Sequence, residues 1–478
     1  MVPHRWHILF LVCTAQFMCV LDDTIVNVAL PSIQHGLGFS NANLPWAING
    51  YLVTFGGLLL LGGRASDLFV RRTVFLAGLV VFGVASLACG MSQGSAALII
   101  SRAAQGIGAA LMSAAALAIL TVTFTGAERN RAFGVWGGLA GAAGALGMLL
   151  GGILTSVLSW RWVFLINVPL VVVVAVMSLR VIPRARAQQR PALDPLGAIS
   201  VTGGLGLLIY AIVHTEQAGW GSPVTLACLT GAAVLLAFFA VAESRHSAPL
   251  IPLGVFRRRN VSGGVICGIL LSASMLALFF FLTLFMQRVL GYSAFENGLA
   301  YLPMSLAVVV TAAMSAQLVG RFGFRTLLVA GFVLIAGAMA WFAQVDVDSS
   351  YVTGLLPPAL IGGAGLGATL VSVITTVTHD LSGEGESGIA SGLVGTVQQM
   401  GGALGISVLS TIAAARTDSA MADSLGTSAA LVEGYQLAFY TAAGVAVAGV
   451  VVALLVVTRP VVAAEKEGAS HPAPAPGA

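Results

Sequence analysis

Apolar runs of about 20 residues alternate with short polar connections along almost the whole chain. A helix of that length crosses the roughly 30 Å of hydrocarbon in a bilayer, whereas a barrel strand needs only about 9 to 11 residues. The pattern therefore predicts an all-α membrane protein with fourteen transmembrane helices. The predicted spans lie near residues 7–31, 43–62, 73–92, 96–121, 133–157, 162–182, 196–214, 223–243, 261–287, 298–319, 326–344, 352–377, 388–414 and 435–458.

The predicted spans form two sets of six with two additional helices between them. A basic loop at residues 63–72 follows the second span, and a similar loop at residues 320–325 follows the second span of the later set. This echo indicates duplicated halves, an arrangement typical of secondary transporters with a site near the midplane. The predicted divisions are an N-terminal six-helix half at 1–182, two additional transmembrane helices with linkers at 183–260, a C-terminal six-helix half at 261–458, and a disordered cytoplasmic tail at 459–478.

The distribution of basic residues predicts the orientation, because cytoplasmic connections carry an excess of Lys and Arg. With an even number of spans, both termini lie on one side. The N-terminal, C-terminal and even-numbered connections, with Arg180 at the adjoining end of the sixth span, hold every Lys and Arg except Arg102, Arg161, Arg288 and Arg416. Both termini are therefore expected in the cytoplasm, and the net charge of +4 reflects orientation and not a nucleic-acid partner.

Composition agrees with this class, since 58% of the residues are hydrophobic and only 8% are charged. The 58 glycines fit helices that pack closely in lipid. All five cysteines lie in apolar runs, so no disulfide framework is expected. The spans contain no nucleophile elbow, no histidine pair at metal spacing and no phosphate loop, so we expect neither an enzyme nor a metal or cofactor site.

Two adjacent acids, Asp22 and Asp23, lie well inside the first predicted span. An ionised carboxylate at membrane depth costs at least roughly 2.5 to 3.5 kcal/mol, so it needs a partner, a proton or water. Arg102 is the basic residue that lies well inside a predicted span. Arg102 lies roughly 9 Å from the outer end of the fourth predicted helix. Asp22 lies roughly 14 Å from the outer end of the first, so the two charges are at similar depth. We therefore expect an Arg102–Asp22 ion pair, the alternative being an arginine held by carbonyls and water.

Several motifs, in order, resemble those of the fourteen-span drug:proton antiporter branch of the major facilitator superfamily. Leu21–Pro31, reading Leu-Asp-Asp-Thr-Ile-Val-Asn-Val-Ala-Leu-Pro, matches the pattern that ends the first helix of that branch. The similarity continues in Leu98–Ala110, Trp160–Pro169, Gln287–Pro303 and Gly388–Gly405. The resemblance implies the major facilitator fold, with two six-helix halves plus two extra helices.

Two motifs depart from the family pattern. In the cytoplasmic loop, Asp67 is kept, but Leu68 replaces an arginine and Val70 replaces the turn glycine. The fifth-helix antiporter motif runs from Gly147 to Gly152 without its proline, which weakens the argument for export over uptake.

The resemblance also implies roles for particular residues. Asp22 would carry the proton, with Arg102 and Asp23 coupled to it, since adjacent acids titrate as a pair; a purely structural Asp22 is the alternative. A loop latch between the halves would involve Asp67, Arg71, Arg72, Arg321 and Arg325. The glycines at 134, 138, 141, 144, 147 and 151 lie on one helical face. We expect this face to pack closely against another helix, and a gating role for that interface is the alternative. The glycines expected to serve in helix packing or gating are Gly147, Gly151 and Gly152. Candidates for lining a substrate cavity are Asn27, Gln105, Met275, Phe281, Phe285 and Gln398.

The expected function is proton-coupled export of small apolar or cationic molecules, such as antibiotics, from the bacterial inner membrane by a monomer. The rival within transport is uptake, or export of the cell's own metabolite. The rivals from other classes are a membrane-embedded enzyme and a non-transporting sensor, but the sequence shows neither a catalytic motif nor a soluble signalling domain. The sequence does not identify the substrate.

Overall fold

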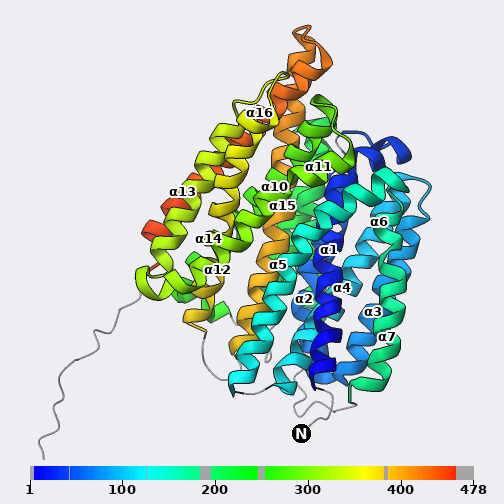
Figure 1. Cartoon of the computed structure of the whole chain (residues 1–478), viewed down its shortest axis with the longest axis vertical. Helices are drawn as coiled ribbons and strands as arrows, with labels where there is room; N and C mark the ends of the chain where they lie inside the picture. Colours follow the sequence, from blue (N-terminus) through cyan, green and yellow to red (C-terminus); the bar gives the residue numbers. More distant parts are fainter. Residues whose placement is uncertain are drawn as a thin grey trace, which may run out of the picture.

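The computed structural model describes residues 5–41, 43–124, 126–183, 195–245, 253–381 and 386–458, and all regular secondary structure in these ranges is helical (Figure 1). The chain begins with α1 (Arg5–Leu37), α2 (Trp46–Leu68), α3 (Arg71–Gly90), α4 (Ser95–Thr123), α5 (Gly126–Val157), α6 (Trp162–Leu165) and α7 (Asn167–Val181). It continues with α8 (Pro195–Ala218), α9 (Pro223–Arg245) and the 3-10 helix η1 (Leu253–Arg257). The remaining helices are α10 (Arg259–Leu284), the π-helix η2 (Phe285–Val289), α11 (Ala294–Ala300), α12 (Leu302–Phe322), α13 (Phe324–Phe342), the π-helix η3 (Tyr351–Leu355), α14 (Leu356–His379), α15 (Glu386–Ala422) and α16 (Thr427–Leu455).

Within the described ranges, 13 helical segments are long and apolar enough to cross a membrane. The fifth predicted position is occupied by α5, whose described apolar part is Leu146–Val157. Together these segments fill the fourteen positions that the hydrophobic pattern predicts, in the same order. The predicted tail at 459–478 lies outside the described residues.

Several helices extend beyond the apolar runs from which they were predicted. α1 continues to Leu37 although Pro31 lies inside it, and α15 continues to Ala422. The predicted tenth span is divided between α11 and α12. Bilayer thickness limits only the apolar part of a helix, because backbone groups beyond the hydrocarbon can bond to water.

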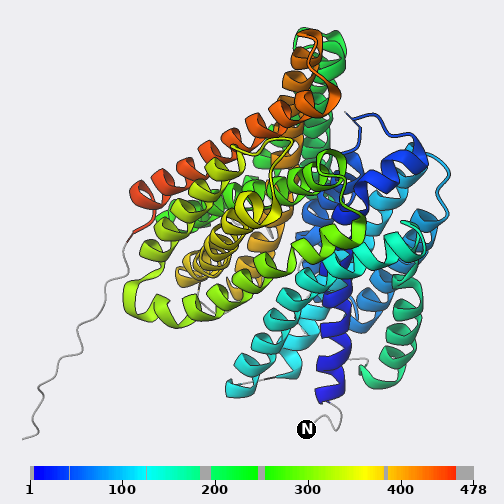
Figure 2. The same ribbon diagram turned by 45° about the horizontal axis from the view of Figure 1, so that its top comes forward.

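The same helix pairings occur early and late in the chain. α2 and α3 both pack on α4, and α12 and α13 both pack on α14. Figures 1 and 2 show the blue-to-cyan helices and the green-to-orange helices as two bundles side by side. α2 packs against α15 between the bundles, and α8 contacts both of these helices. The residue boundaries of the halves remain a prediction.

Glycines bring α3 and α4 close together. A Cβ on Gly108 would lie 2.4 Å from the Phe82 nitrogen, and one on Gly78 would lie 2.5 Å from the Met112 nitrogen. Glycine therefore permits a backbone approach that a larger residue would prevent. This crossing holds α4, the helix that carries Arg102, against α3.

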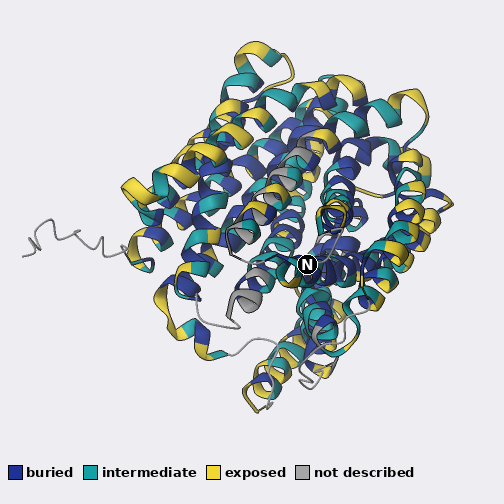
Figure 3. Cartoon of the chain, turned by 60° about the horizontal axis from the view of Figure 1, so that its bottom comes forward, coloured by how far each residue is buried: buried dark blue, intermediate teal, exposed yellow. Residues whose placement is uncertain are grey.

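α1 occupies the interior of its bundle. Leu21, Asp22 and Ile25 are at most 1% exposed, and Figure 3 shows buried residues concentrated between the helices while exposed residues cover the outside. Asp22 therefore faces protein and not the lipid that would surround the bundle.

Candidate functional site

The carboxylate of Asp22 accepts three short hydrogen bonds in a fully buried position. Arg102 Nη1 lies 2.5 Å from its Oδ2, and Gln105 Nε2 donates to its Oδ1 over 2.7 Å. Asn167 Nδ2 donates to the same Oδ1 over 2.8 Å. All four side chains have zero exposed fraction. The ion pair expected from the sequence is therefore present, and two neutral amides support it.

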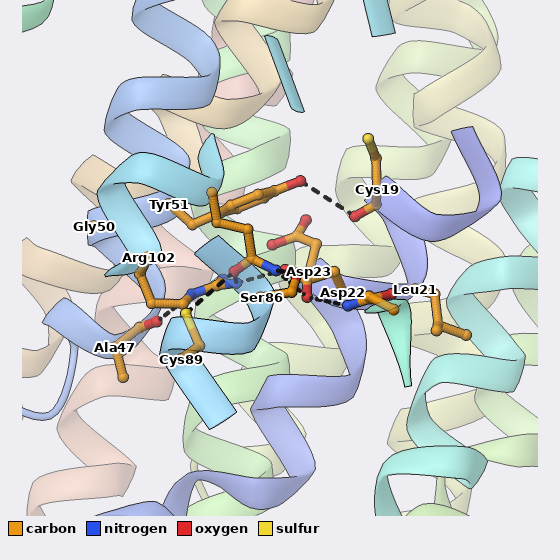
Figure 4. A network of polar contacts seen from close by, with 12 residues as sticks. Cys19, Leu21, Asp22, Asp23, Ala47, Gly50, Tyr51, Ser86, Cys89 and Arg102 are labelled. Carbon is orange, nitrogen blue, oxygen red and sulfur yellow. Dashed lines mark hydrogen bonds and ion pairs between the residues drawn. The ribbon is translucent and has the colours of Figure 1, made fainter. Parts of the chain in front are cut away.

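Arg102 is held from several directions. Its Nε donates to the Ala47 carbonyl of α2 over 2.9 Å, and its Nη1 also donates to Gln105 Oε1 over 2.7 Å. The guanidinium carbon lies 4.4 Å from the ring centroid of Tyr51 and 5.7 Å from that of Phe164. A cation over an aromatic face is stabilised by the ring quadrupole, more strongly where water is excluded. These contacts fix the guanidinium opposite Asp22 (Figure 4).

Gln105 connects the ion pair to α3. Its Nε2 donates to Ser86 Oγ over 2.8 Å in addition to Asp22, and its Oε1 lies 3.7 Å from the Cys89 sulfur. Because it lies one helical turn from Arg102, it meets the same carboxylate as that arginine. The cavity role of Gln105 remains a prediction, and the hydrogen-bonding groups of this side chain are already engaged in the network.

Sequence reasoning did not select Asn167, Ser86 or Tyr51 as site residues. Asn167 could have been selected from the sequence, because it lies inside the Trp160–Pro169 motif and places a polar amide in an apolar run. Ser86 is harder to select, because a serine hydroxyl in a helix can donate a hydrogen bond to a backbone carbonyl of its own helix. Asn167 of α7 bonds to Asp22 itself. Ser86 of α3 joins the network through Gln105, and Tyr51 of α2 joins it through Arg102. Only the packing of these helices with α1 and α4 brings the side chains together.

Asp23 differs from its neighbour. Its side chain is half-buried and its Oδ1 is buried without a hydrogen-bond partner. Asn27, one turn later on α1, donates to the Asp23 backbone oxygen over 3.0 Å, leaving its own Oδ1 without a partner. Asp22 is thus saturated with donors, whereas Asp23 is not.

The network is suited to reversible protonation. Protonation of Asp22 removes the negative charge that pairs with Arg102, and a buried arginine without a counterion is costly. Binding or loss of one proton at Asp22 would therefore alter contacts among α1, α2, α3, α4 and α7, and the proton-carrying role of Asp22 remains a prediction. In the described part of the chain, no group of three or more His, Cys, Asp or Glu residues could hold a metal ion.

The N-half loop residues predicted to form a latch are described only in part. The side chain of Asp67 lies outside the described residues. Arg71 is half-buried, and Arg72 Nη1 donates to the Ile182 carbonyl at the end of α7 over 3.2 Å. This contact stays within the first bundle.

The corresponding arginines of the second bundle behave similarly. Arg325 donates to the Leu454 carbonyl near the end of α16. The guanidinium carbon of Arg321 lies 5.3 Å from the ring centroid of the adjacent Phe322. A latch that joins the two halves through these loops remains a prediction.

Contacts between the bundles occur at the end where α1 finishes. Gln287 Nε2 donates to the Val28 carbonyl over 2.8 Å. Arg288 Nη1 donates to Asn41 Oδ1 over 3.3 Å, and its Nη2 donates to Gln34 Oε1. The π-helix η2, which carries both donors, therefore ties the end of α10 to α1.

The three glycines predicted for packing or gating lie at two helix contacts. A Cβ on Gly147 would lie 2.0 Å from Thr24 Oγ1, and one on Gly151 would lie 2.7 Å from a backbone oxygen of α1. A Cβ on Gly152 would lie 2.5 Å from the Ala294 oxygen of α11, in the other bundle. These glycines allow close packing at the α1 and α11 contacts, and their gating role remains a prediction.

The other cavity candidates differ in accessibility. Asn27, Phe281 and Phe285 are at most 2% exposed. Met275 and Gln398 are half-buried. Phe281 lies with rings of α16 in the second bundle, at ring-centroid distances of 6.0 and 6.3 Å. Whether these residues line a substrate cavity remains a prediction.

Comparison of the sequence with family models finds a match to the Major Facilitator Superfamily over residues 12–406. The chain is 38% identical to the puromycin resistance protein pur8 of Streptomyces alboniger, over 99% of this chain and 95% of that protein. It is 40% identical to the cephamycin export protein CmcT of Amycolatopsis lactamdurans, over 87% of this chain and 86% of that protein. It is 34% identical to the lincomycin resistance protein of Streptomyces lincolnensis, over 85% and 84% of the two chains.

The fold also resembles solved transporter structures. A bacterial homolog of the human lysosomal transporter Spinster superposes with a TM-score of 0.68 at 15% identity, covering 95% of this chain and 97% of that one. The human organic anion transporter MFSD10 superposes with a TM-score of 0.61 at 17% identity, covering 94% and 100%. At this identity the comparison concerns the fold alone.

Proposed function

Because the chain belongs to the major facilitator superfamily, we propose that it exports small apolar or cationic molecules, antibiotics among them, in exchange for protons. It is a multi-pass membrane transporter and not an enzyme, and its relatives named for antibiotic resistance or export support efflux. The proposal adds proton coupling, a bacterial inner-membrane location, cytoplasmic termini and a monomeric unit.

The observation that carries the proposal is the buried Asp22–Arg102 pair. Its atoms lie 2.5 Å apart and neither side chain is exposed. Removing a charged pair from water is unfavourable, and a hydrophobic pair of similar volume often stabilises a fold at least as well. A buried pair that can lose its negative charge to a proton is therefore better explained by a working role than by stability alone.

The proposed cycle follows from the contacts of α1. A proton that enters from outside neutralises Asp22, and Arg102 loses its counterion. The donors from α4 and α7 then lose a charged acceptor, so the packing around α1 changes. Since α1 also contacts α10 and α11 of the second bundle, this change would shift one half against the other and open the site to the opposite side. Release of the proton inside restores the pair.

The test uses inside-out vesicles from cells that express the full chain, acidified inside and monitored with a pH-sensitive dye. Addition of puromycin, cephamycin or lincomycin should discharge the proton gradient with wild-type protein. Asp22→Asn should abolish that response. Glu433→Gln serves as a matched control, because it neutralises an acid paired with Arg416 at 2.5 Å, remote from the network.

The response of the control should equal that of the wild type. Puromycin, cephamycin or lincomycin transport that leaves the proton gradient untouched would contradict proton coupling. An undiminished response from Asp22→Asn would contradict the assigned proton carrier.

A further inference from the structure

Asn167 meets Asp22 with only half of its amide group. Its Nδ2 donates to Asp22 Oδ1 over 2.8 Å, while its Oδ1 is buried without a hydrogen-bond partner among the described residues. The side chain has no exposed surface, so bulk water does not reach that oxygen. A buried acceptor without a donor is uncommon and costs free energy in a folded protein. A second state of the network, in which this oxygen gains a donor, would explain its presence.

The hydrogen-bonding chemistry of Asp22 fixes the present orientation of the amide. An ionised carboxylate only accepts, so the Asn167 atom that faces it is the nitrogen and not the oxygen. A protonated Asp22 instead carries one O–H donor, which needs an acceptor where water is absent. Its Oδ2 lies 2.5 Å from the guanidinium of Arg102, which only donates, so the proton belongs on Oδ1. Binding of a proton therefore requires one hydrogen bond at Oδ1 to reverse its direction.

Two amides reach Oδ1, and they differ in what a reversal would cost. Gln105 Oε1 already accepts from Arg102 Nη1 over 2.7 Å, so turning this amide would place its nitrogen against the donors of a cation. Its Nε2 also donates to Ser86 Oγ over 2.8 Å. Asn167 Oδ1 gives up no donor of the described network when it turns. The torsion that turns it is a terminal one with a broad, roughly two-fold preference, so the reversal costs least at Asn167.

We propose that Asn167 accepts the hydrogen bond of protonated Asp22 through a half-turn of its side-chain amide. With Asp22 ionised, Asn167 Nδ2 donates to Oδ1. With Asp22 protonated, the new O–H donates to Asn167 Oδ1. The proposal rests on the proton-carrying role proposed above for Asp22 and adds one residue to that machinery. The proton stays on the carboxyl group, and no covalent bond of Asn167 changes.

The half-turn makes two helices that bind Asp22 respond differently to a proton. α7, which begins at Asn167, keeps one hydrogen bond to α1 in both protonation states. α4 loses the charged contact between Arg102 and Asp22. Protonation therefore acts mainly on the contact between α1 and α4, while α7 stays attached to α1.

Other titratable side chains also act on Asp22. The described groups that interact with it electrostatically are Arg102 of α4, Asp23 and Cys19 of α1, Tyr51 of α2 and Cys89 of α3. The thiols and the phenol are neutral near pH 7 in their ordinary state. Among these groups Asp23 is the other carboxylic acid, so its protonation has to be distinguished from that of Asp22.

The test is infrared difference spectroscopy between neutral and acidic pH, on the purified full chain in lipid nanodiscs. Asparagine labelled with carbon-13 at Cγ separates its side-chain carbonyl bands from those of the backbone. A carbonyl that gains a hydrogen bond absorbs at lower frequency, so one labelled band of the wild type should shift down as the carboxylic acid band of Asp22 appears. Asn167→Leu and Asp22→Asn should each lose that downshift, and Asp23→Asn should keep it.

A second readout is the carboxylic acid band of Asp22 itself. In Asn167→Leu the O–H has no acceptor at this position, so the band should lie at higher frequency than in the wild type. Asn167→Gln keeps an amide and should return the band toward its wild-type position, which separates loss of the acceptor from poor folding of the leucine variant. A merely structural Asn167 would leave its labelled carbonyl band in place while Asp22 takes up its proton.

Gln105 supplies the matched control, because it is the other amide that donates to the same oxygen. With glutamine labelled in place of asparagine, no downshift that belongs to Gln105 is expected. A glutamine downshift that disappears in Gln105→Met would assign the acceptor role to that residue and overturn the proposal. An asparagine downshift that persists in Asn167→Leu, or an Asp22 band without any downshift, would also overturn it.

Failure of the proposed function gives a different result. If both bands respond but vesicles show no proton-coupled transport, the half-turn of Asn167 stands and proton-coupled export does not. If transport is proton-coupled and the Asp22 band appears without the labelled downshift, export stands and the half-turn does not. If no Asp22 band appears at any pH at which transport proceeds, the roles of both residues fall.

Discussion

The first helix of each bundle packs in a similar setting but carries different chemistry. α1 places Asp22 in a fully buried polar network with Arg102, Gln105 and Asn167. α10 instead places aromatic side chains in the interior of the second bundle, and the Phe281 ring lies against rings of α16. In the described ranges, the ion pair in which both side chains are fully buried is that of the first bundle.

Because of this difference, the central contacts of the first bundle depend on protonation, whereas those of the second bundle depend on the shape of apolar side chains. A hydrogen-bonded ion pair depends on one charge, so a single proton can disrupt it. An aromatic cluster gains its stability from apolar contact and ring geometry, which do not change with protonation. We therefore expect changes in the first bundle to alter coupling and changes in the second to alter packing or cargo preference.

The largest effect is expected from Asp22→Asn. The variant removes the carboxylate that is hydrogen-bonded to Arg102, and breaking a buried ion pair typically destabilises a protein by about 3–5 kcal/mol. It should lower the melting temperature of the purified protein and abolish proton-driven efflux. Thermal unfolding in detergent and dye-monitored efflux measure the two effects, and pH-dependent efflux at the wild-type rate would contradict the contrast between the bundles.

Arg102→Met should stall exchange by a different route. It removes the cation that favours ionised Asp22, so the acid keeps its proton and cannot release it inside. Adding Asp22→Asn should cost little more transport, because the partners act as one unit. The double variant should also be more stable than Asp22→Asn alone. A double-mutant cycle with clearly additive losses would show that the residues do not work together.

Asn167→Leu should give a smaller defect. It removes one neutral donor to Asp22 Oδ1 while Gln105 still donates to the same oxygen. Hydrogen bonds to charged groups contribute roughly 1.5–3 kcal/mol, so a reduction in coupled transport of about tenfold or more is expected. The pH profile of efflux should shift, whereas Asn167→Gln should recover part of the wild-type profile. A loss of rate without any shift of the profile would indicate a packing defect only.

Phe281→Leu should have the smallest effect on coupling. It removes contacts with two rings of α16, each worth roughly 0.5–1.5 kcal/mol. Thermal stability should fall modestly, and the pH profile of efflux should stay that of the wild type. A shifted pH profile would mean that proton coupling extends into the second bundle and would break the comparison.

The class, the number and order of the spans, and the family could all be predicted from the sequence. These follow from local properties, because the length of an apolar run is set by bilayer thickness and the motifs are contiguous. The charges at similar depth in the first and fourth spans were also sufficient to predict the Asp22–Arg102 pair, since a lone buried charge is so costly.

The other groups that reach this pair could not be predicted from the sequence, because they depend on how the helices pack in three dimensions. Asn167 and Ser86 lie 145 and 19 residues from their network partners, and such contacts depend on how each helix is rotated against its neighbours. The same rotation engages Gln105 in the network, buries Phe281 in the second bundle and leaves Asp23 without a donor. Hydrophobic periodicity places residues along a helix axis, but the direction each side chain faces is fixed by packing against helices distant in the chain.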